Sequence, residues 1–210
     1  MKEDKEENMI ENIHWLGHAS FKITNDKKIF IDPYQLKKKE TADIILITHS
    51  HYDHCSRDDV DMLKGPQTVI ITTKDSASQL SGNIKIINPG ETITEAGIQI
   101  EAVPAYNMRK AFHPKENNWV GFIITVGGKR IYHTGDSDAI PEMNNIKADI
   151  VLIPVGGTYT MTAEEAAQVI NKIMPEFAIP MHYGTIIGSS SDAQKLANLS
   201  KVPVKILNKE

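Results

Sequence analysis

The chain has 210 residues, of which 40% are hydrophobic, so it is long enough to bury a core of its own. Its formal net charge is -4 and its basic residues are not interleaved with aromatic ones, so a nucleic-acid partner is not indicated. A single cysteine excludes an internal disulfide, and no apolar stretch reaches the length of a membrane span. With no signal-peptide pattern, we expect a cytoplasmic protein with a small-molecule substrate and no membrane partner; the sequence is compatible with a homo-oligomer.

Strand patterns dominate the first two thirds of the chain, after a charged opening. Residues 1–9 offer almost nothing to bury and are predicted to be a disordered or frayed tail. No low-complexity stretch or long linker follows, so a single domain is expected over residues 10–210. Residues 12–34 and 119–137 read as strands joined by tight turns, at Asn-Asp and Gly-Gly respectively.

A second pattern repeats after each of these segments. The runs "ADIILI" and "ADIVLI" are rich in β-branched residues, which is typical of strands covered on both faces. In both halves the hairpin precedes this buried strand, which favours an internal duplication of a β-β-β-α unit. Convergent composition is the alternative, because strands rich in isoleucine resemble one another. Two such halves facing each other predict a sandwich.

Helices are predicted where a capping residue and an apolar period of 3.6 residues agree. Thr162 and Glu165 have the spacing of a capping box, and Ser56 is a second candidate N-cap. A final strand is predicted over residues 202–207. The predicted helices cover residues 56–65, 162–174 and 190–200.

The sequence "THSHYDHC" gathers three histidines and an aspartate directly after a buried strand. In an extended segment residues two apart point the same way, so His49 and His51 are expected to project together. A turn at Tyr52 would bring Asp53 and His54 to face them. Imidazole and carboxylate ligands together suit zinc first, with manganese and iron as alternatives. The competing interpretation is a group of surface histidines that cap a helix.

Two further polar side chains follow apolar strands elsewhere in the sequence. Asp136 comes after Gly135 in "HTGDSD", and His182 lies in "MHYGT". Taken singly, Asp136 could be a turn residue and His182 a packed histidine. Together with the histidine cluster they favour metal ligation, with Asp136 bridging two cations.

The order of these motifs resembles the metallo-β-lactamase fold superfamily. Within it, "WLGHASF", "FIDP", "GGTYTM" and "PMHYGT" resemble the compact hydrolases related to ascorbate-phosphate lactonase. The resemblance covers nearly the whole chain and implies an α/β fold, a four-layer αββα sandwich of two mixed sheets with the metals at one edge. It also implies that Asp32 and His18 orient the metal ligands without binding the metal themselves. The metal ligands implied are His49, His51, Asp53, His54, Asp136 and His182.

The chain departs from the superfamily pattern at one ligand position. A further histidine usually occupies a loop between the histidine cluster and "HTGD", where this chain has Tyr106 and Asn107. His113 could fill the position from a few residues further on, or it could be an ordinary loop histidine. Tyr106 could instead present its hydroxyl to the substrate. Without a loop histidine, the first metal site would have only His49, His51 and the bridging Asp136 as ligands. Occupancy by one ion rather than two would then follow.

Metal-activated water attacking an ester-type bond, either a phosphoester or a lactone, is the predicted reaction. Asp53 and Asp136 are the predicted catalytic residues. The backbone of Gly156 and Gly157 could offer N–H groups to an anion, or it could simply form a tight turn. Two other functions remain open: a non-catalytic ligand-binding or sensor protein that contains a metal, and an iron-dependent redox enzyme.

Overall fold

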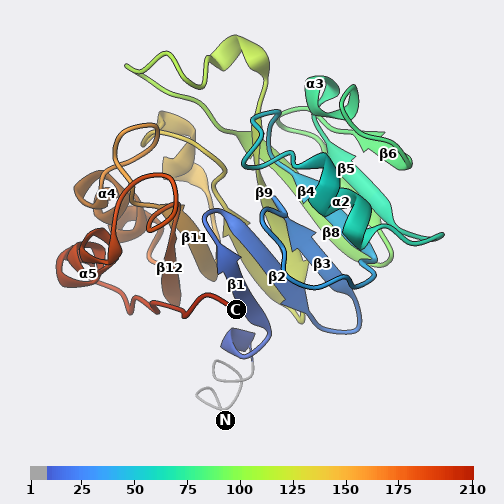
Figure 1. The fold of residues 1–210 in the computed structure, drawn as a ribbon. Coiled ribbons are helices and arrows are strands. Elements are labelled where there is room, and N and C mark those ends of the chain that lie inside the picture. Colours follow the sequence, from blue (N-terminus) through green and yellow to red (C-terminus); the bar gives the residue numbers. More distant parts are fainter. Residues whose placement is uncertain (1–8) are drawn as a thin grey trace. The chain divides into compact units, whose positions relative to one another are not determined.

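The computed structural model describes residues 9–210 and divides into two compact units. The first unit contains the chain up to Ile86 together with Leu207–Glu210, and the second contains Ile87–Ile206. Within the described residues, each unit is built on one six-stranded mixed sheet with helices beside it (Figure 1). This is the α/β architecture that the sequence predicts.

The first unit holds the two strand patterns of the N-terminal half. Its strands lie across the sheet in chain order. The first three pair antiparallel and the others pair parallel. The elements are β1 (Ile13–Gly17), β2 (Ser20–Thr24), β3 (Lys28–Ile31), β4 (Ile44–Ile47), α2 (Arg57–Leu63), β5 (Val69–Thr72), α3 (Lys74–Ala77) and β6 (Asn83–Ile86).

The second unit has the sheet order β12-β11-β10-β9-β8-β7. The pairings of β10 with β11 and of β11 with β12 are parallel, and the other three are antiparallel. The elements are β7 (Thr92–Glu95), β8 (Ile98–Pro104), η1 (Lys115–Asn117), β9 (Val120–Val126), β10 (Lys129–His133), η2 (Pro141–Asn145), β11 (Ile150–Pro154), α4 (Ala163–Ile173), β12 (Phe177–Met181) and α5 (Ser190–Leu199).

The two units repeat one topology, which confirms the predicted duplication. Strands β1 to β5 pair as antiparallel, antiparallel, parallel and parallel, and strands β8 to β12 pair in the same order. A helix follows the fourth strand in each series: α2 after β4 and α4 after β11. Convergent composition would not reproduce the order of strand directions and the place of the crossover helix together.

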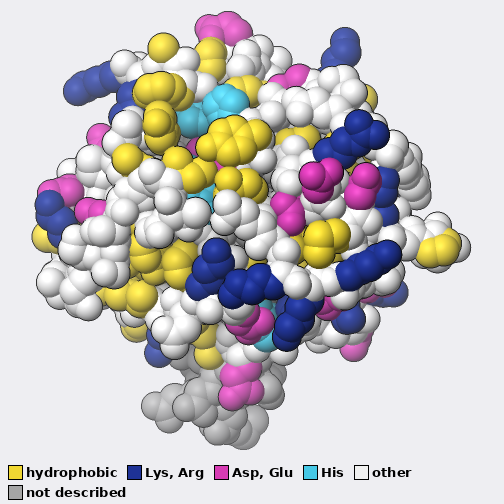
Figure 2. Space-filling view, viewed as in Figure 1, with side chains coloured by type: hydrophobic (Ala, Val, Ile, Leu, Met, Phe, Trp, Pro, Cys, Tyr) yellow, Lys and Arg dark blue, Asp and Glu magenta, His cyan; other side chains and the backbone are white. Residues whose placement is uncertain are grey.

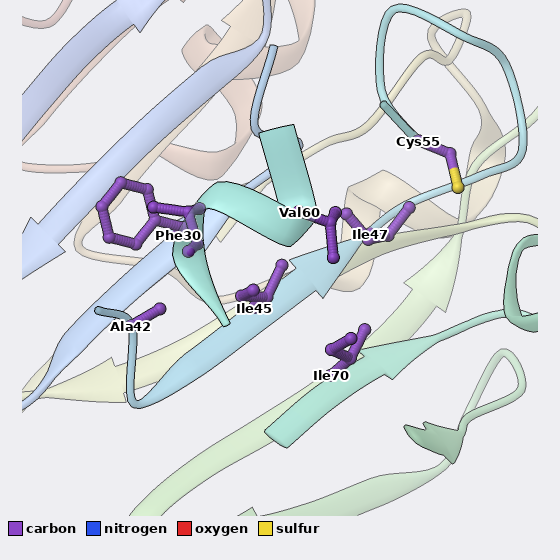
Figure 3. Close-up of a cluster of buried hydrophobic side chains, with 8 residues drawn as sticks. Phe30, Ala42, Ile45, Ile47, Cys55, Val60 and Ile70 are labelled. Carbon is purple, nitrogen blue, oxygen red and sulfur yellow. The ribbon is translucent and has the colours of Figure 1, made fainter. Parts of the chain in front are cut away.

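The core of the first unit forms because β4 is apolar on both faces. Every residue of β4 and of β11 is fully buried. On one face of β4, Ile45 and Ile47 pack with Val60 and Leu63 of α2 (Figure 3). Burial of each such side chain contributes about 1.5–3 kcal/mol. Cys55 belongs to the same cluster and is 4% exposed, as expected for a small buried residue.

Local signals fix the ends of α4. The Thr162 side chain accepts a hydrogen bond from the Glu165 backbone N–H, and the Glu165 carboxylate accepts one from the Thr162 backbone N–H, so the predicted capping box is present. The helix ends at Met174, which has a left-handed φ of 53°. It packs against β11 and against α5 (Figure 1).

The final strand predicted over residues 202–207 is wrong. Only one isolated bridge forms, between Val204 and Ala178 of β12. Pro203 has no N–H to donate, so it contributes only its carbonyl, which accepts a hydrogen bond from the Ala178 N–H. One proline in a segment this short leaves too few donors to continue a ladder.

The predicted tail lies outside the described residues except for Met9, which is buried. The expectation of a single domain over residues 10–210 stays a prediction. Of the helices in the described part of the chain, none has the length and apolar character needed to cross a membrane.

Candidate metal centre

A tight turn at the end of β4 gathers the histidine cluster. The backbone N–H groups of His54 and Cys55 both donate to the carbonyl of His51, at 3.0 and 2.7 Å. This reverses the chain so that the ring of His54 lies 4.1 Å, centroid to centroid, from the ring of His49. His49 Nε2 and His51 Nδ1 are 3.1 Å apart, so the two side chains project together as the sequence predicts.

Asp32, directly after β3, orients two of these histidines. The Thr48 N–H donates to Asp32 Oδ1 at 2.8 Å, the Thr48 hydroxyl donates to Oδ2 at 2.7 Å, and His54 Nδ1 lies 2.7 Å from Oδ2. Because the carboxylate can only accept, His54 carries its proton on Nδ1. The Thr48 hydroxyl has given its one proton to Asp32, so it accepts from His49 Nδ1 at 2.9 Å. In their neutral form both imidazoles therefore carry the lone pair on Nε2, the state a metal ligand requires.

His18 holds Asp53 in a similar way. His18 Nε2 lies 2.9 Å from Asp53 Oδ2, and His18 is 1% exposed. One atom each of His18, Asp53 and His54 lies within 4.8 Å of the other two. His18 thus contacts a predicted ligand, and its supporting role stays a prediction.

The second unit contains a matching group around Asp136. Gly135 has a φ of 63° and bends the chain at the end of β10, which places the Asp136 carboxylate next to two histidines. Asp136 Oδ2 lies 2.9 Å from His182 Nε2 and 3.4 Å from His113 Nε2. All three side chains are at least 96% buried.

The spacings within each unit fit a metal ion. Two ligands of a tetrahedral zinc ion, each at about 2.05 Å, lie roughly 3.3 Å from one another. The measured separations of 3.1, 2.9 and 3.4 Å are close to that value. Several nitrogen and carboxylate atoms held this close in a buried setting are costly unless a cation or proton is shared among them.

His113, rather than Tyr106, lies beside Asp136. The Tyr106 hydroxyl donates to the carboxylate of Glu142, at 2.9 and 3.1 Å, and accepts from Lys115 Nζ at 3.2 Å. Burial raises the pKa of the Tyr106 phenol, so it stays protonated. The alternative in which Tyr106 presents its hydroxyl to the substrate is therefore not favoured by its hydrogen bonds.

Backbone strain marks three of these positions. His18, Asp32 and His182 have left-handed φ values of 52°, 45° and 58°. This region is uncommon for residues other than glycine, and such residues persist only when surrounding contacts fix them. Each directly follows a turn or a strand end, where the strained backbone redirects a polar side chain.

Gly156 allows the close approach that His182 requires. A Cβ at Gly156 would lie 2.5 Å from the backbone oxygen of His182, closer than any real contact. The N–H of Gly157 donates to Met161 at 3.0 Å, inside the loop. The tight turn is thus the correct interpretation of this loop, and the anion-binding alternative is wrong for the Gly157 N–H.

The two remaining histidines are not among the predicted ligands. His133 accepts a hydrogen bond from the Gly135 N–H at 3.2 Å, and His14 lies 2.6 Å from Glu210. Figure 2 shows histidine side chains at the molecular surface, and His51 is half-buried. Sequence reasoning missed the supporting roles of four residues: Thr48, Asn107, Asp138 and Gly156. Thr48 and Asp138 lie within the motifs themselves, next to His49 and two residues after Asp136, which was the available signal.

The comparison with known proteins decides the family. Residues 12–182 match the family model described as the beta-lactamase superfamily domain. The chain belongs to the beta-lactamase superfamily. A UPF0173 metal-dependent hydrolase of Thermoplasma acidophilum is 35% identical over 208 residues, with 90% of each chain covered.

Solved structures agree with this membership. A protein of Parabacteroides distasonis matches this superfamily member with a TM-score of 0.82 and 33% identity, covering 92% of this chain and 91% of that one. Igni18, a metallo hydrolase of Ignicoccus hospitalis, matches with a TM-score of 0.76 and 26% identity, covering 94% of both. The resemblance read from the sequence motifs is confirmed.

Proposed function

We propose that this superfamily member is a metal-dependent hydrolase that acts on an ester-type bond of a small molecule, a phosphoester or a lactone. The observation that carries the proposal is the Asp32 network, which presents the Nε2 lone pairs of His49 and His54 at the end of β4. Membership of the beta-lactamase superfamily and the hydrolase description of a relative that is 35% identical support it.

Each donor group is proposed to supply metal ligands. Zinc is the first choice because imidazole and carboxylate predominate, and one or two ions would be bound. The proposed ligands are His49, His51, Asp53, His54, Asp136 and His182, with His113 in the position of the missing loop histidine.

The cation, once bound, would lower the pKa of a coordinated water to about 7, so that no side-chain nucleophile is needed. Asp53 is proposed to accept the proton of the attacking water, because the hydrogen bond from His18 Nε2 fixes its carboxylate. Asp136 is proposed to share the bound cation with the imidazoles of His113 and His182, whose Nε2 atoms lie 3.4 and 2.9 Å from its Oδ2.

The test is metal analysis followed by a substrate screen. Protein purified without added metal is analysed for zinc, manganese and iron. It is then assayed with phosphodiester, phosphomonoester, lactone and thioester substrates. The variants His49→Ala and His182→Ala each remove one donor, and His14→Ala is the matched control because His14 contacts only Thr24 and Glu210 among the contacts resolved for its ring. We expect both donor variants to lose metal and turnover, and the control to keep both.

Two results would support other functions. Full metal occupancy with no turnover of any substrate class would favour a ligand-binding or sensor protein. Iron as the bound metal, with oxygen consumption, would favour a redox enzyme. Either result contradicts the proposed hydrolase.

A further inference from the structure

The loop between β8 and β9 contains a buried hydrogen-bond network centred on Asn107. This side chain is 8% exposed. Its Oδ1 accepts from the backbone N–H of His113 at 3.0 Å and lies 3.0 Å from His113 Nδ1. Its Nδ2 donates to Asp138 Oδ1 and to the carbonyl of Tyr159, both at 3.0 Å. The Asn107 backbone N–H also donates to the carbonyl of His113, at 2.8 Å.

These partners leave one orientation for the Asn107 amide. A backbone N–H can only donate, so the atom facing the His113 N–H must be the oxygen. A carboxylate and a carbonyl can only accept, so the atom facing Asp138 and Tyr159 must be the nitrogen. Rotating the amide by 180° would set donor against donor at one end and acceptor against acceptor at the other. The hydrogen-bond partners alone therefore determine which atom of the Asn107 amide is the oxygen and which is the nitrogen.

The fixed amide in turn fixes the tautomer of His113. Because Asn107 Oδ1 is an acceptor, His113 Nδ1 must carry the proton, which places the lone pair of the neutral ring on Nε2. That nitrogen lies 3.4 Å from Asp136 Oδ2, which is also an acceptor. Two acceptors that face each other at this distance in a buried site repel unless a cation or a proton lies between them.

The amide is itself held by a partly buried ion pair between Lys110 and Asp138. Lys110 Nζ donates to Asp138 Oδ1 at 2.7 Å and to the carbonyl of Thr160 at 2.6 Å, and the Met108 N–H donates to Asp138 Oδ2 at 2.9 Å. Asp138 is 6% exposed, so its charge needs these donors. These donors therefore keep the Asp138 carboxylate aligned with the Asn107 amide.

We propose that Asn107 is the positioning residue of His113, holding its imidazole with Nδ1 protonated and Nε2 directed at Asp136 as a metal ligand. The proposal rests on the proposed metal-dependent function. It explains how the chain replaces the loop histidine that is missing at Tyr106. His113, six residues after Asn107, supplies the ligand, and Asn107 orients it. Outer partners of this kind typically change metal affinity 10- to 100-fold when removed.

The first test reads the tautomer directly and needs no variant of Asn107. Long-range ¹H–¹⁵N correlation spectra of the protein titrated with zinc, at a pH of about 8, distinguish a protonated ring nitrogen from one that carries a lone pair or a metal. His113→Gln assigns the signal. We expect the proton on Nδ1. A proton on Nε2 overturns the proposal whether or not zinc binds, so this result is independent of the proposed function.

The second test is a double-mutant cycle on zinc affinity, measured by competition with a chelator. Asn107→Ala is expected to weaken zinc binding 10- to 100-fold in the native background and to have no further effect in His113→Ala. Asn144→Ala is the control, because Asn144 is exposed and its only resolved contact is with Lys172. It is expected to leave zinc affinity unchanged.

The results distinguish a failure of the role proposed for Asn107 from a failure of the proposed metal-dependent function. An equal loss from Asn107→Ala in both backgrounds means that Asn107 acts on the fold at large, which overturns the proposal. Unchanged affinity in His113→Ala removes His113 from the ligands and also overturns it, although the other ligands could still support hydrolysis. Absence of zinc binding by the native protein contradicts the proposed zinc site instead, and the tautomer alone then tests the role proposed for Asn107.

Discussion

Replacing Asp32 by asparagine isolates the part that its charge plays in the site. Asp32 is fully buried and accepts three hydrogen bonds, two from Thr48 and one from His54. Asparagine also tolerates the left-handed φ of 45° at this position, so the substitution adds little backbone strain. The effect should therefore come from the lost carboxylate.

The size of the effect follows from the three bonds. The amide oxygen of asparagine can keep the two bonds made by Asp32 Oδ2, but without charge assistance, at a cost of about 1 kcal/mol each. Its amide nitrogen then faces the Thr48 N–H, and a buried donor left unsatisfied costs about 1–3 kcal/mol. We expect Asp32→Asn to lower the free energy of unfolding by about 3–5 kcal/mol and metal affinity by about 10- to 100-fold.

Urea denaturation with a chelator present measures the free energy of unfolding, and competition with a chelator measures the metal affinity. Asp43→Asn is the matched control: Asp43 also accepts a backbone N–H, from Lys28, but is 39% exposed. We expect this control to change stability by less than about 1 kcal/mol. If Asp32→Asn behaves like the control in both assays, the charge of Asp32 does not strengthen the hydrogen bonds that hold His49 and His54, and the Asp32 network no longer supports the metal site.

Three other predictions follow from the structure. Gly156→Ala should displace His182, since the new Cβ would lie 2.5 Å from its carbonyl oxygen, and should lower the melting temperature and the metal content together; normal metal content would contradict the close contact. Burial raises the pKa of the Cys55 thiol to about 12, so at pH 8 it stays protonated and should react with iodoacetamide only after denaturation; fast labelling of the native protein would disprove this. Thr162→Ala removes half of the capping box of α4 and should cost about 1 kcal/mol in urea denaturation, whereas an unchanged midpoint would show that Glu165 caps the helix alone.

The sequence by itself determined the features that depend on near neighbours in the chain. Apolar runs predicted β4 and β11, and the spacing of Thr162 and Glu165 predicted the start of α4. The period of two residues in an extended segment predicted that His49 and His51 project together. The repeated order of these patterns predicted the duplicated topology, because strand direction and crossover length follow from the same local signals.

Only the tertiary structure decided which distant side chains support the ligands. Asn107 bonds to Asp138 and Tyr159, which are 31 and 52 positions away, and nothing in the local pattern distinguishes it from an ordinary loop residue. The positions of Tyr106 and His113 also depend on distant contacts, because His113 Nε2 lies 3.4 Å from Asp136 Oδ2 while the Tyr106 hydroxyl bonds to Glu142. A hydrogen bond between separate segments depends on where two backbones place a donor and an acceptor to within a few tenths of an ångström. Packing of the whole unit sets that distance, and a residue type at one position in the sequence does not specify it.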